Sequence, residues 1–168
     1  MNLYWQDWLT LAIMAAVTVI QTVRGSKAGM GLPLFEAACV IVAAVAAIAH
    51  SHTLADMIHA RQGVVLLGLF IVLAVLAFAV ARWLYVLTGL SFQSLDGVLS
   101  FVFGLVLAWT VAHMVLRAMV MSAGDIDAAS VLANSPVARE VFSFRTWNAL
   151  MRLMFKARFG PDLDPDIG

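Results

Sequence analysis

The chain has 168 residues, of which 63% are hydrophobic and 12% are charged, and its mean hydropathy is +0.96. A soluble domain is about half apolar and about one quarter charged, so this composition indicates that lipid is the main solvent. Lys and Arg balance Asp and Glu at 10 each, without the basic excess typical of a nucleic-acid binder. The single cysteine excludes an internal disulfide and signals no redox chemistry.

Four apolar stretches are long enough to predict membrane-spanning helices. They run from about Trp8 to Val23, from Leu34 to Ala49, from Gly63 to Ala81 and from Val98 to Met114. Because lipid offers no hydrogen bonds, each backbone can satisfy its polar groups only as a helix. Residues 1–7 contain no Lys or Arg, so we expect the first stretch to be retained rather than cleaved as a signal peptide. We therefore predict an all-α membrane protein with a four-helix transmembrane domain over residues 1–121.

A glycine-rich turn is predicted after the first span. Gly25, Gly29 and Gly31 tolerate unusual backbone angles, and Pro33 suits the first turn of the helix that follows. We therefore expect a flexible polar connection, with the second helix starting near Pro33. That helix should pack inside the bundle, because it carries the small residues that let helices approach closely in membranes: Ala43, Ala44, Ala46 and Ala47.

Residues 50–62 are polar and predict a loop with a short surface helix. Within it, His52, Asp56 and His59 have the i, i+4, i+7 spacing that aligns three metal ligands on one helix face. Polar loops also contain histidines without binding metal, and no further ligand motif accompanies these three residues. We therefore predict no metal site and no cofactor.

After Met121 the hydrophobicity ends, and residues 122–134 predict a polar linker. A capping side chain at Ser135, followed by Pro136, predicts a helix start. Residues 135–159 then predict an amphipathic C-terminal helix, which suits the membrane surface, a partner or the protein's own bundle. The residues expected to make the membrane-surface or partner contact are Arg145, Trp147, Arg152 and Lys156. Residues 160–168 predict a disordered acidic tail.

Three ionisable residues inside predicted spans are candidates for a polar path. Glu36 enters the second span, while His113 and Arg117 are four residues apart on one face of the fourth. Alternatively, Glu36 pairs with Arg24 or Lys27 at the interface, Arg117 extends to the headgroups, and His113 bonds to a neighbouring helix. Serine nucleophile elbows, phosphate loops and paired inward carboxylates are absent from the sequence, so we expect no enzyme and no catalytic residues.

Several short motifs accompany these features. Asp7 precedes the first span, Arg24-Gly25 ends it, and Glu36 enters the second. Thr88-Gly89-Leu90-Ser91 is followed by Asp96-x-Val98-Leu99 and Phe103-Gly104. On these motifs, over about residues 5–120, the chain resembles the bacterial colicin V production protein family, CvpA. The resemblance implies structural importance for Arg24, Gly25, Glu36, Gly89, Asp96 and Gly104.

What the resemblance implies is a multi-pass protein of the bacterial inner membrane that supports toxin production or export, or envelope homeostasis. We expect a non-enzymatic membrane factor whose partners are the lipid bilayer and either a second copy or other envelope membrane proteins, with no nucleic acid. Four short helices with small-residue faces enclose little on their own, which favours a homo-oligomer. The alternative is a small channel or transporter with a polar path through Glu36, His113 and Arg117.

The distribution of basic residues bears on the orientation of the spans. Arg24, Lys27 and Arg82 fall on one side of the predicted membrane, whereas Arg61, Arg117 and the basic C-terminal helix fall on the other. The first helix usually dominates, and its flanks place Asp7 before it and two basic residues after it. We therefore expect both termini to lie outside the cytoplasm.

Overall fold

The structure, a computed structural model, describes residues 5–91, 94–122 and 135–143. It contains helices α1 (Trp5–Ala28), α2 (Gly31–Ile58), α3 (Gln62–Thr88), α4 (Asp96–Ser122) and α6 (Pro136–Ser143), and no strand within the described ranges. The first four are long and apolar enough to cross a membrane, which confirms the prediction of an all-α, multi-pass membrane protein. The predicted amphipathic helix is described only as far as Ser143, and the predicted linker beyond Ser122 and the acidic tail lie outside the described residues.

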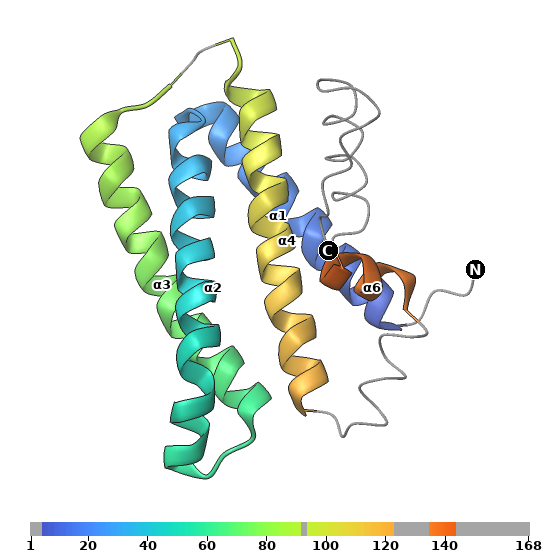
Figure 1. The fold of residues 1–168 in the computed structure, drawn as a ribbon. Helices are drawn as coiled ribbons and strands as arrows, with labels where there is room; N and C mark the ends of the chain where they lie inside the picture. Colours follow the sequence, from blue (N-terminus) through green and yellow to red (C-terminus); the bar gives the residue numbers. More distant parts are fainter. Residues whose placement is uncertain (1–4, 92–93, 123–134, 144–168) are drawn as a thin grey trace, which may run out of the picture.

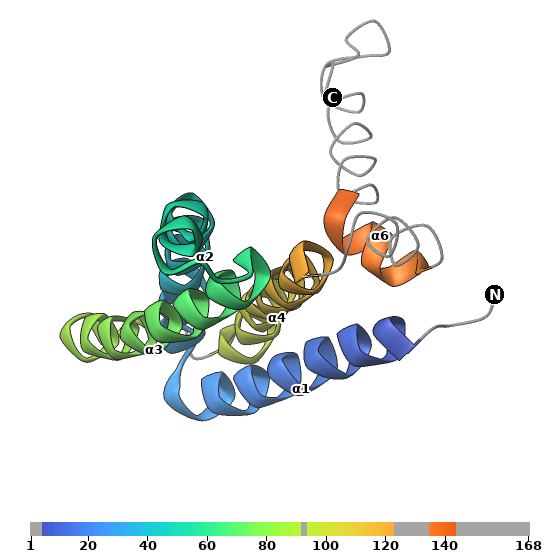
Figure 2. The same cartoon turned by 90° about the horizontal axis from the view of Figure 1, so that it is seen from below.

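The four long helices form two closely packed pairs, α2 with α3 and α1 with α4 (Figure 1). Seen along the bundle, α4 lies between α1 and the pair formed by α2 and α3 (Figure 2). The apolar core lies where α2, α3 and α4 meet and contains Val40, Leu66, Phe70, Leu107 and Met114. The predicted inward face of the second span is confirmed for three of its four alanines, at positions 43, 44 and 47, which are buried in this core, whereas Ala46 is half-buried and lines the outer side of α2.

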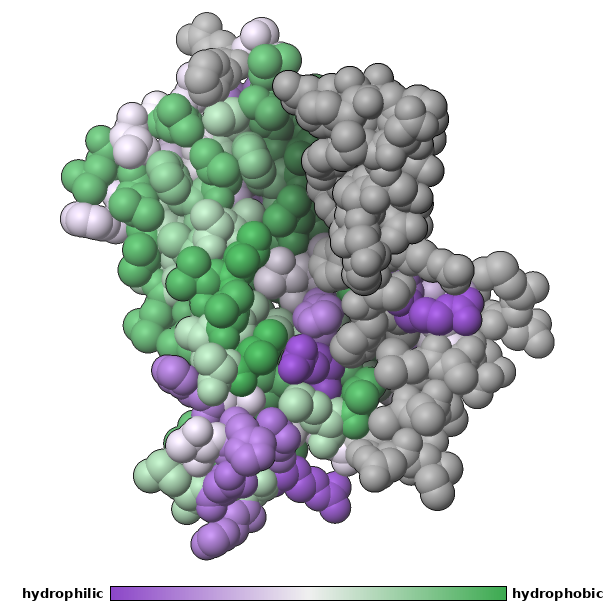
Figure 3. Space-filling model, in the orientation of Figure 1, coloured by the Kyte–Doolittle hydropathy of each residue, from purple (hydrophilic) through white to green (hydrophobic). Residues whose placement is uncertain are grey.

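The outward faces of α2 and α3 are apolar and exposed, as lipid contact requires. Val45 on α2 is 62% exposed, and Val75 on α3 is 64% exposed. Apolar side chains cover much of the visible face, and hydrophilic side chains gather at the end where α2 meets α3 (Figure 3). This distribution places the α2–α3 connection beyond one edge of the apolar layer.

The second helix extends further than its hydropathy predicts. It has 28 residues, which at 1.5 Å per residue gives about 42 Å, longer than the roughly 30 Å hydrocarbon layer. The loop predicted over residues 50–62 is therefore wrong for its first part, which is helical to Ile58. Extending a helix that has already formed costs less than starting a new one, so α2 continues into these polar residues. A side-chain contact one turn apart supports the extension, because His52 Nδ1 lies 2.9 Å from Asp56 Oδ2.

The predicted flexible turn between the first two spans is in fact tight. α1 continues to Ala28 and α2 begins at Gly31, so only two residues connect them. Gly29 has a φ of 98°, a left-handed conformation that glycine adopts without steric cost. The Gly31 amide donates to the Leu90 carbonyl at 3.2 Å, and a Cβ atom on Gly31 would lie 2.6 Å from that oxygen. These glycines therefore permit close contact with the α3–α4 connection rather than flexibility.

The α1–α4 pair approaches closely because its contact face is small. Every fourth residue on one face of α4 is small and buried: Ser100, Gly104, Ala108 and Ala112. A Cβ atom on Gly104 would lie 2.9 Å from Gln21 Cβ of α1, so a larger residue there would push the helices apart. This spacing of small residues is the pattern that brings helix backbones together in membranes.

Candidate functional site

Most residues that carry the family resemblance gather around the α1–α2 turn, whereas Asp7 lies at the other end of α1. Four elements contribute them: α1, α2, the α3–α4 connection and the first turns of α4. They meet because α1 crosses α4 on its small-residue face and because the turn bonds to the α3–α4 connection. We call the polar side chains at this place the turn cluster, which consists of Gln21, Arg24, Glu36, Ser91 and Asp96.

Glu36 is the most deeply buried charge of the turn cluster, with 2% of its surface exposed. Arg24 donates from Nη2 to Oε1 at 2.9 Å and from Nη1 to Oε2 at 3.2 Å, and Gln21 donates from Nε2 to Oε2. Such a forked arginine–carboxylate contact compensates for the cost of removing the carboxylate from water. The ion-pair alternative for Glu36 is therefore confirmed, with Arg24 as the partner.

Asp96 fastens the α1–α2 turn to the start of α4. Its Oδ1 accepts a hydrogen bond from the Met30 amide at 3.0 Å, and its Oδ2 accepts one from the Ser91 hydroxyl at 2.6 Å. It lies in the first turn of α4, where the helix dipole also favours a negative charge. A further bond closes the same region, because the Tyr85 hydroxyl donates to the Ala28 carbonyl.

The structure gives two different reasons why glycine occupies the three glycine positions of the resemblance. Gly89 ends α3 with a φ of 56°, and its amide donates to the Tyr85 carbonyl at 2.9 Å. No atom lies within 4 Å of a Cβ atom built there, so the backbone conformation alone favours glycine. Gly25 and Gly104 instead permit the close crossing of α1 and α4.

His113 and Arg117 do not join Glu36. His113 follows Gly104 by nine positions, or about 14 Å along α4, so these two side chains lie towards the opposite end of the helix. His113 Nδ1 lies 3.5 Å from the Val141 carbonyl of α6, and Arg117 Nε is buried without a hydrogen-bond partner in the described structure. The structure therefore separates the predicted path into two groups.

A third buried carboxylate joins α1 to α6. Asp7 is fully buried, and its Oδ1 accepts hydrogen bonds from the Ser135 hydroxyl at 2.5 Å and from the Val137 amide at 2.9 Å. The helix start at Pro136 is confirmed. Asp7 of α1 supplies an acceptor for an amide of the first turn of α6, because a carboxylate is a strong acceptor at a helix N-terminus.

Sequence reasoning missed Gln21 and the contact between Asp7 and Ser135. A signal was present, because the buried residues of α1 recur at helical spacing: Asp7, Thr10, Thr18, Gln21 and Gly25. In a membrane such a polar stripe turns inward, away from lipid. Several oxygens where α1 packs on α4 have no hydrogen-bond partner in the described structure: Thr18 Oγ1, Gln21 Oε1 and Ser100 Oγ.

The remaining predicted residues lie elsewhere. His52 and Asp56 contact each other on the last turns of α2, with His59 at its end, and no group of three possible metal ligands occurs within residues 5–91, 94–122 and 135–143. The residues expected at the membrane surface lie outside the described residues: Arg145, Trp147, Arg152 and Lys156.

Comparison of the chain with protein-family models, with curated proteins and with solved structures found no match in any of the three. The class of the protein therefore follows from its own fold and contacts. It is an all-α, multi-pass membrane protein in which α1 carries the polar contacts and α2 and α3 face outward with apolar side chains.

Proposed function

We propose that the protein is a non-enzymatic factor of the bacterial inner membrane, of the colicin V production type, that supports toxin export or envelope homeostasis by binding partners. The observation that carries the proposal is that the charges of the turn cluster are bonded within the chain. Arg24 pairs with Glu36, and Asp96 accepts from the Met30 amide. Charges that are bonded within the chain hold the helices in position. All three of these charged residues are among those that the family resemblance marks as structurally important.

An apolar groove on the outer side of α2 and α3 supports partner binding. It encloses about 380 Å³ and is lined by side chains that include Ala38, Cys39, Ala46, Leu73 and Leu76. Small residues at such a surface let a further helix approach closely. The partner that we propose is a second copy of this chain or another membrane protein of the envelope.

Complementation of a strain that lacks the protein tests the proposal. We expect Glu36→Gln and His113→Ala to restore toxin export and resistance to envelope stress, because neither substitution removes the partner-binding surface. Truncation before Ser135 should abolish both phenotypes, because it removes the C-terminal helix that the sequence predicts as a second membrane-surface or partner contact. Immunoblots of the membrane fraction establish equal amounts of each variant. Loss of function in either point variant at normal abundance, or full function of the truncated chain, contradicts the proposal.

A small channel or transporter is the second candidate. It is supported by polar atoms that have no hydrogen-bond partner among the residues that the structure describes, namely oxygens of Thr18, Gln21 and Ser100 on the α1–α4 contact and the buried Nε of Arg117. In this proposal Glu36, His113 and Arg117 line the polar path. Ion or proton flux into liposomes that contain the purified protein tests it: a flux that His113→Ala and Glu36→Gln both abolish supports transport, and the absence of flux excludes it.

A further inference from the structure

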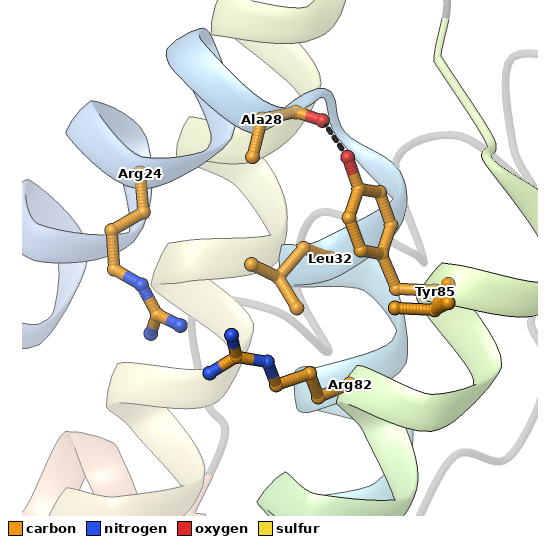
Figure 4. A pocket seen from close by; sticks show the side chains of 6 residues that line it. Arg24, Ala28, Leu32, Arg82 and Tyr85 are labelled. Carbon is orange, nitrogen blue, oxygen red and sulfur yellow. Dashed lines mark hydrogen bonds between the residues drawn. The ribbon is translucent and has the colours of Figure 1, made fainter.

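A pocket between α1, α2 and α3 lies beside the turn cluster. It encloses about 300 Å³ and is lined by Arg24, Ala28, Leu32, Arg82, Tyr85 and Val86. Arg24 and Arg82 enter it from opposite sides with their guanidinium groups turned towards one another (Figure 4). Two cations from different helices thus face one small space.

The donors of this pocket are not all used by the protein. A guanidinium has five N–H donors, of which Arg24 uses two on Glu36. Arg82 is exposed and forms no hydrogen bond or ion pair with any residue that the structure describes. The two arginines and Glu36 together leave one positive charge, and no carboxylate lines the pocket. The pocket therefore suits an anion and offers no acceptor for an ammonium group.

The position of the pocket along the bundle indicates which anion reaches it. The uncharged stretch of α3 ends immediately before Arg82, and the exposed Trp83 follows it, as is typical of the interfacial layer. This is the level at which lipid phosphates lie. The remaining wall is apolar and includes Leu32 and Val86, the second of which is 73% exposed on the lipid-facing side.

We propose that this pocket binds the phosphate of an anionic phospholipid. Arg24 and Arg82 donate to the phosphate oxygens from two sides, because a planar guanidinium matches phosphate in a forked geometry. The glycerol end of the lipid lies along Leu32 and Val86. Bound in this way, the lipid bridges α1 and α3 next to the turn cluster.

Native mass spectrometry of the full chain in an uncharged detergent tests the proposal. The probes are phosphatidylglycerol, phosphatidylcholine as the zwitterionic comparison, and millimolar inorganic phosphate as a competitor. We expect phosphatidylglycerol to bind about tenfold more tightly than phosphatidylcholine, because the two arginines repel the choline cation, and we expect inorganic phosphate not to displace it. Equal binding of the two lipids overturns the proposal, and displacement by phosphate assigns the pocket to a free anion instead.

Two variants act on the pocket by different routes. Arg82→Gln removes its unpaired charge, and Val86→Trp fills the space while keeping both arginines. Arg61→Gln is the matched control, because it also removes an exposed charge, at the other end of α3. We expect both pocket variants to weaken phosphatidylglycerol binding about tenfold and the control to leave it unchanged. Wild-type affinity in either pocket variant that retains wild-type helicity, or an equal loss in the control, overturns the proposal.

Discussion

A buried carboxylate stabilises this protein only while it keeps its partners. Glu36 is 2% exposed, whereas 46% of the Arg24 side-chain surface is exposed. The two members of the pair are therefore not equivalent. Removal of the guanidinium leaves a buried charge with only Gln21 beside it, but removal of the carboxylate charge leaves an arginine that still reaches solvent.

Substitution of the two partners should reveal this asymmetry. We expect Arg24→Met to lower the free energy of unfolding by about 3 kcal/mol, the lower end for a broken buried pair, because Arg24 is half exposed. Glu36→Gln should cost about 1 kcal/mol, since the amide keeps the shape and some hydrogen bonding. The double variant should resemble Glu36→Gln. Denaturant titration in mild detergent, followed by circular dichroism, measures all three, and equal losses in the two single variants contradict the argument.

Gly25 lies where α1 packs too closely on its neighbours to leave room for a side chain. A Cβ atom on Gly25 would lie 2.0 Å from Ser100 Oγ and 2.7 Å from Pro33 Cγ, so Gly25→Ala forces α1 away from α4. We expect a loss of about 1–3 kcal/mol in the free energy of unfolding, typical of overpacking. Gly97→Ala is the matched control, because it lies in a helix with open space around its Cβ. The same titration compares them, and equal stability of the two variants would show that the α1–α4 crossing tolerates a methyl group.

Among the elements, α6 is held by a residue far away in sequence. Asp7 of α1 accepts from the Val137 amide and the Ser135 hydroxyl, and Val141 of α6 packs on Leu116 of α4. A helix of eight residues is too short to be stable alone, so these contacts maintain it. The described part of the C-terminal segment thus packs on the protein's own bundle.

Loss of the cap should release α6. We expect Asp7→Ala to remove about 1–2 kcal/mol, as loss of an N-cap acceptor does, and to raise hydrogen exchange across residues 136–143. Ser135→Ala should have a smaller effect, because the bond from the Val137 amide to Asp7 remains. Exchange followed by mass spectrometry compares the two variants with the wild type. Unchanged protection in Asp7→Ala means that apolar packing alone holds the helix.

Hydropathy predicted the number and order of the spans, but not where their helices end. The prediction stopped the second helix at Ala49 because polar residues follow, yet helical hydrogen bonds continue to Ile58 outside the apolar layer. The site was predictable only in part. An ion-pair partner for Glu36 was expected within twelve residues, whereas the bond from Met30 to Asp96 joins positions 66 apart and depends on the packing of all four helices.

At the scale of the whole molecule, four membrane-spanning helices place the connections between them alternately on the two sides of the membrane. The α1–α2 turn and the α3–α4 connection lie together and are bonded, as shown by the Gly31 amide donating to Leu90. The α2–α3 connection lies at the opposite end, with the last turn of α4 beside the first of α3, since a Cβ atom on Gly63 would lie 2.1 Å from Ser122 Oγ. The pocket that we assign to lipid belongs to the side that carries Arg24 and Arg82.

Cysteine labelling tests both the crossings and the orientation. In a Cys39→Ala background, Ala60→Cys and Ser94→Cys place single exposed thiols on the two opposite connections. Because the basic residues follow the first helix, we expect a membrane-impermeant reagent to label Ala60→Cys in intact cells and Ser94→Cys only after permeabilisation. Labelling of both from one side contradicts the four crossings. The reverse pattern keeps the crossings but moves the arginine pocket from the inner leaflet, where anionic lipid is attracted to basic residues, to the outer one.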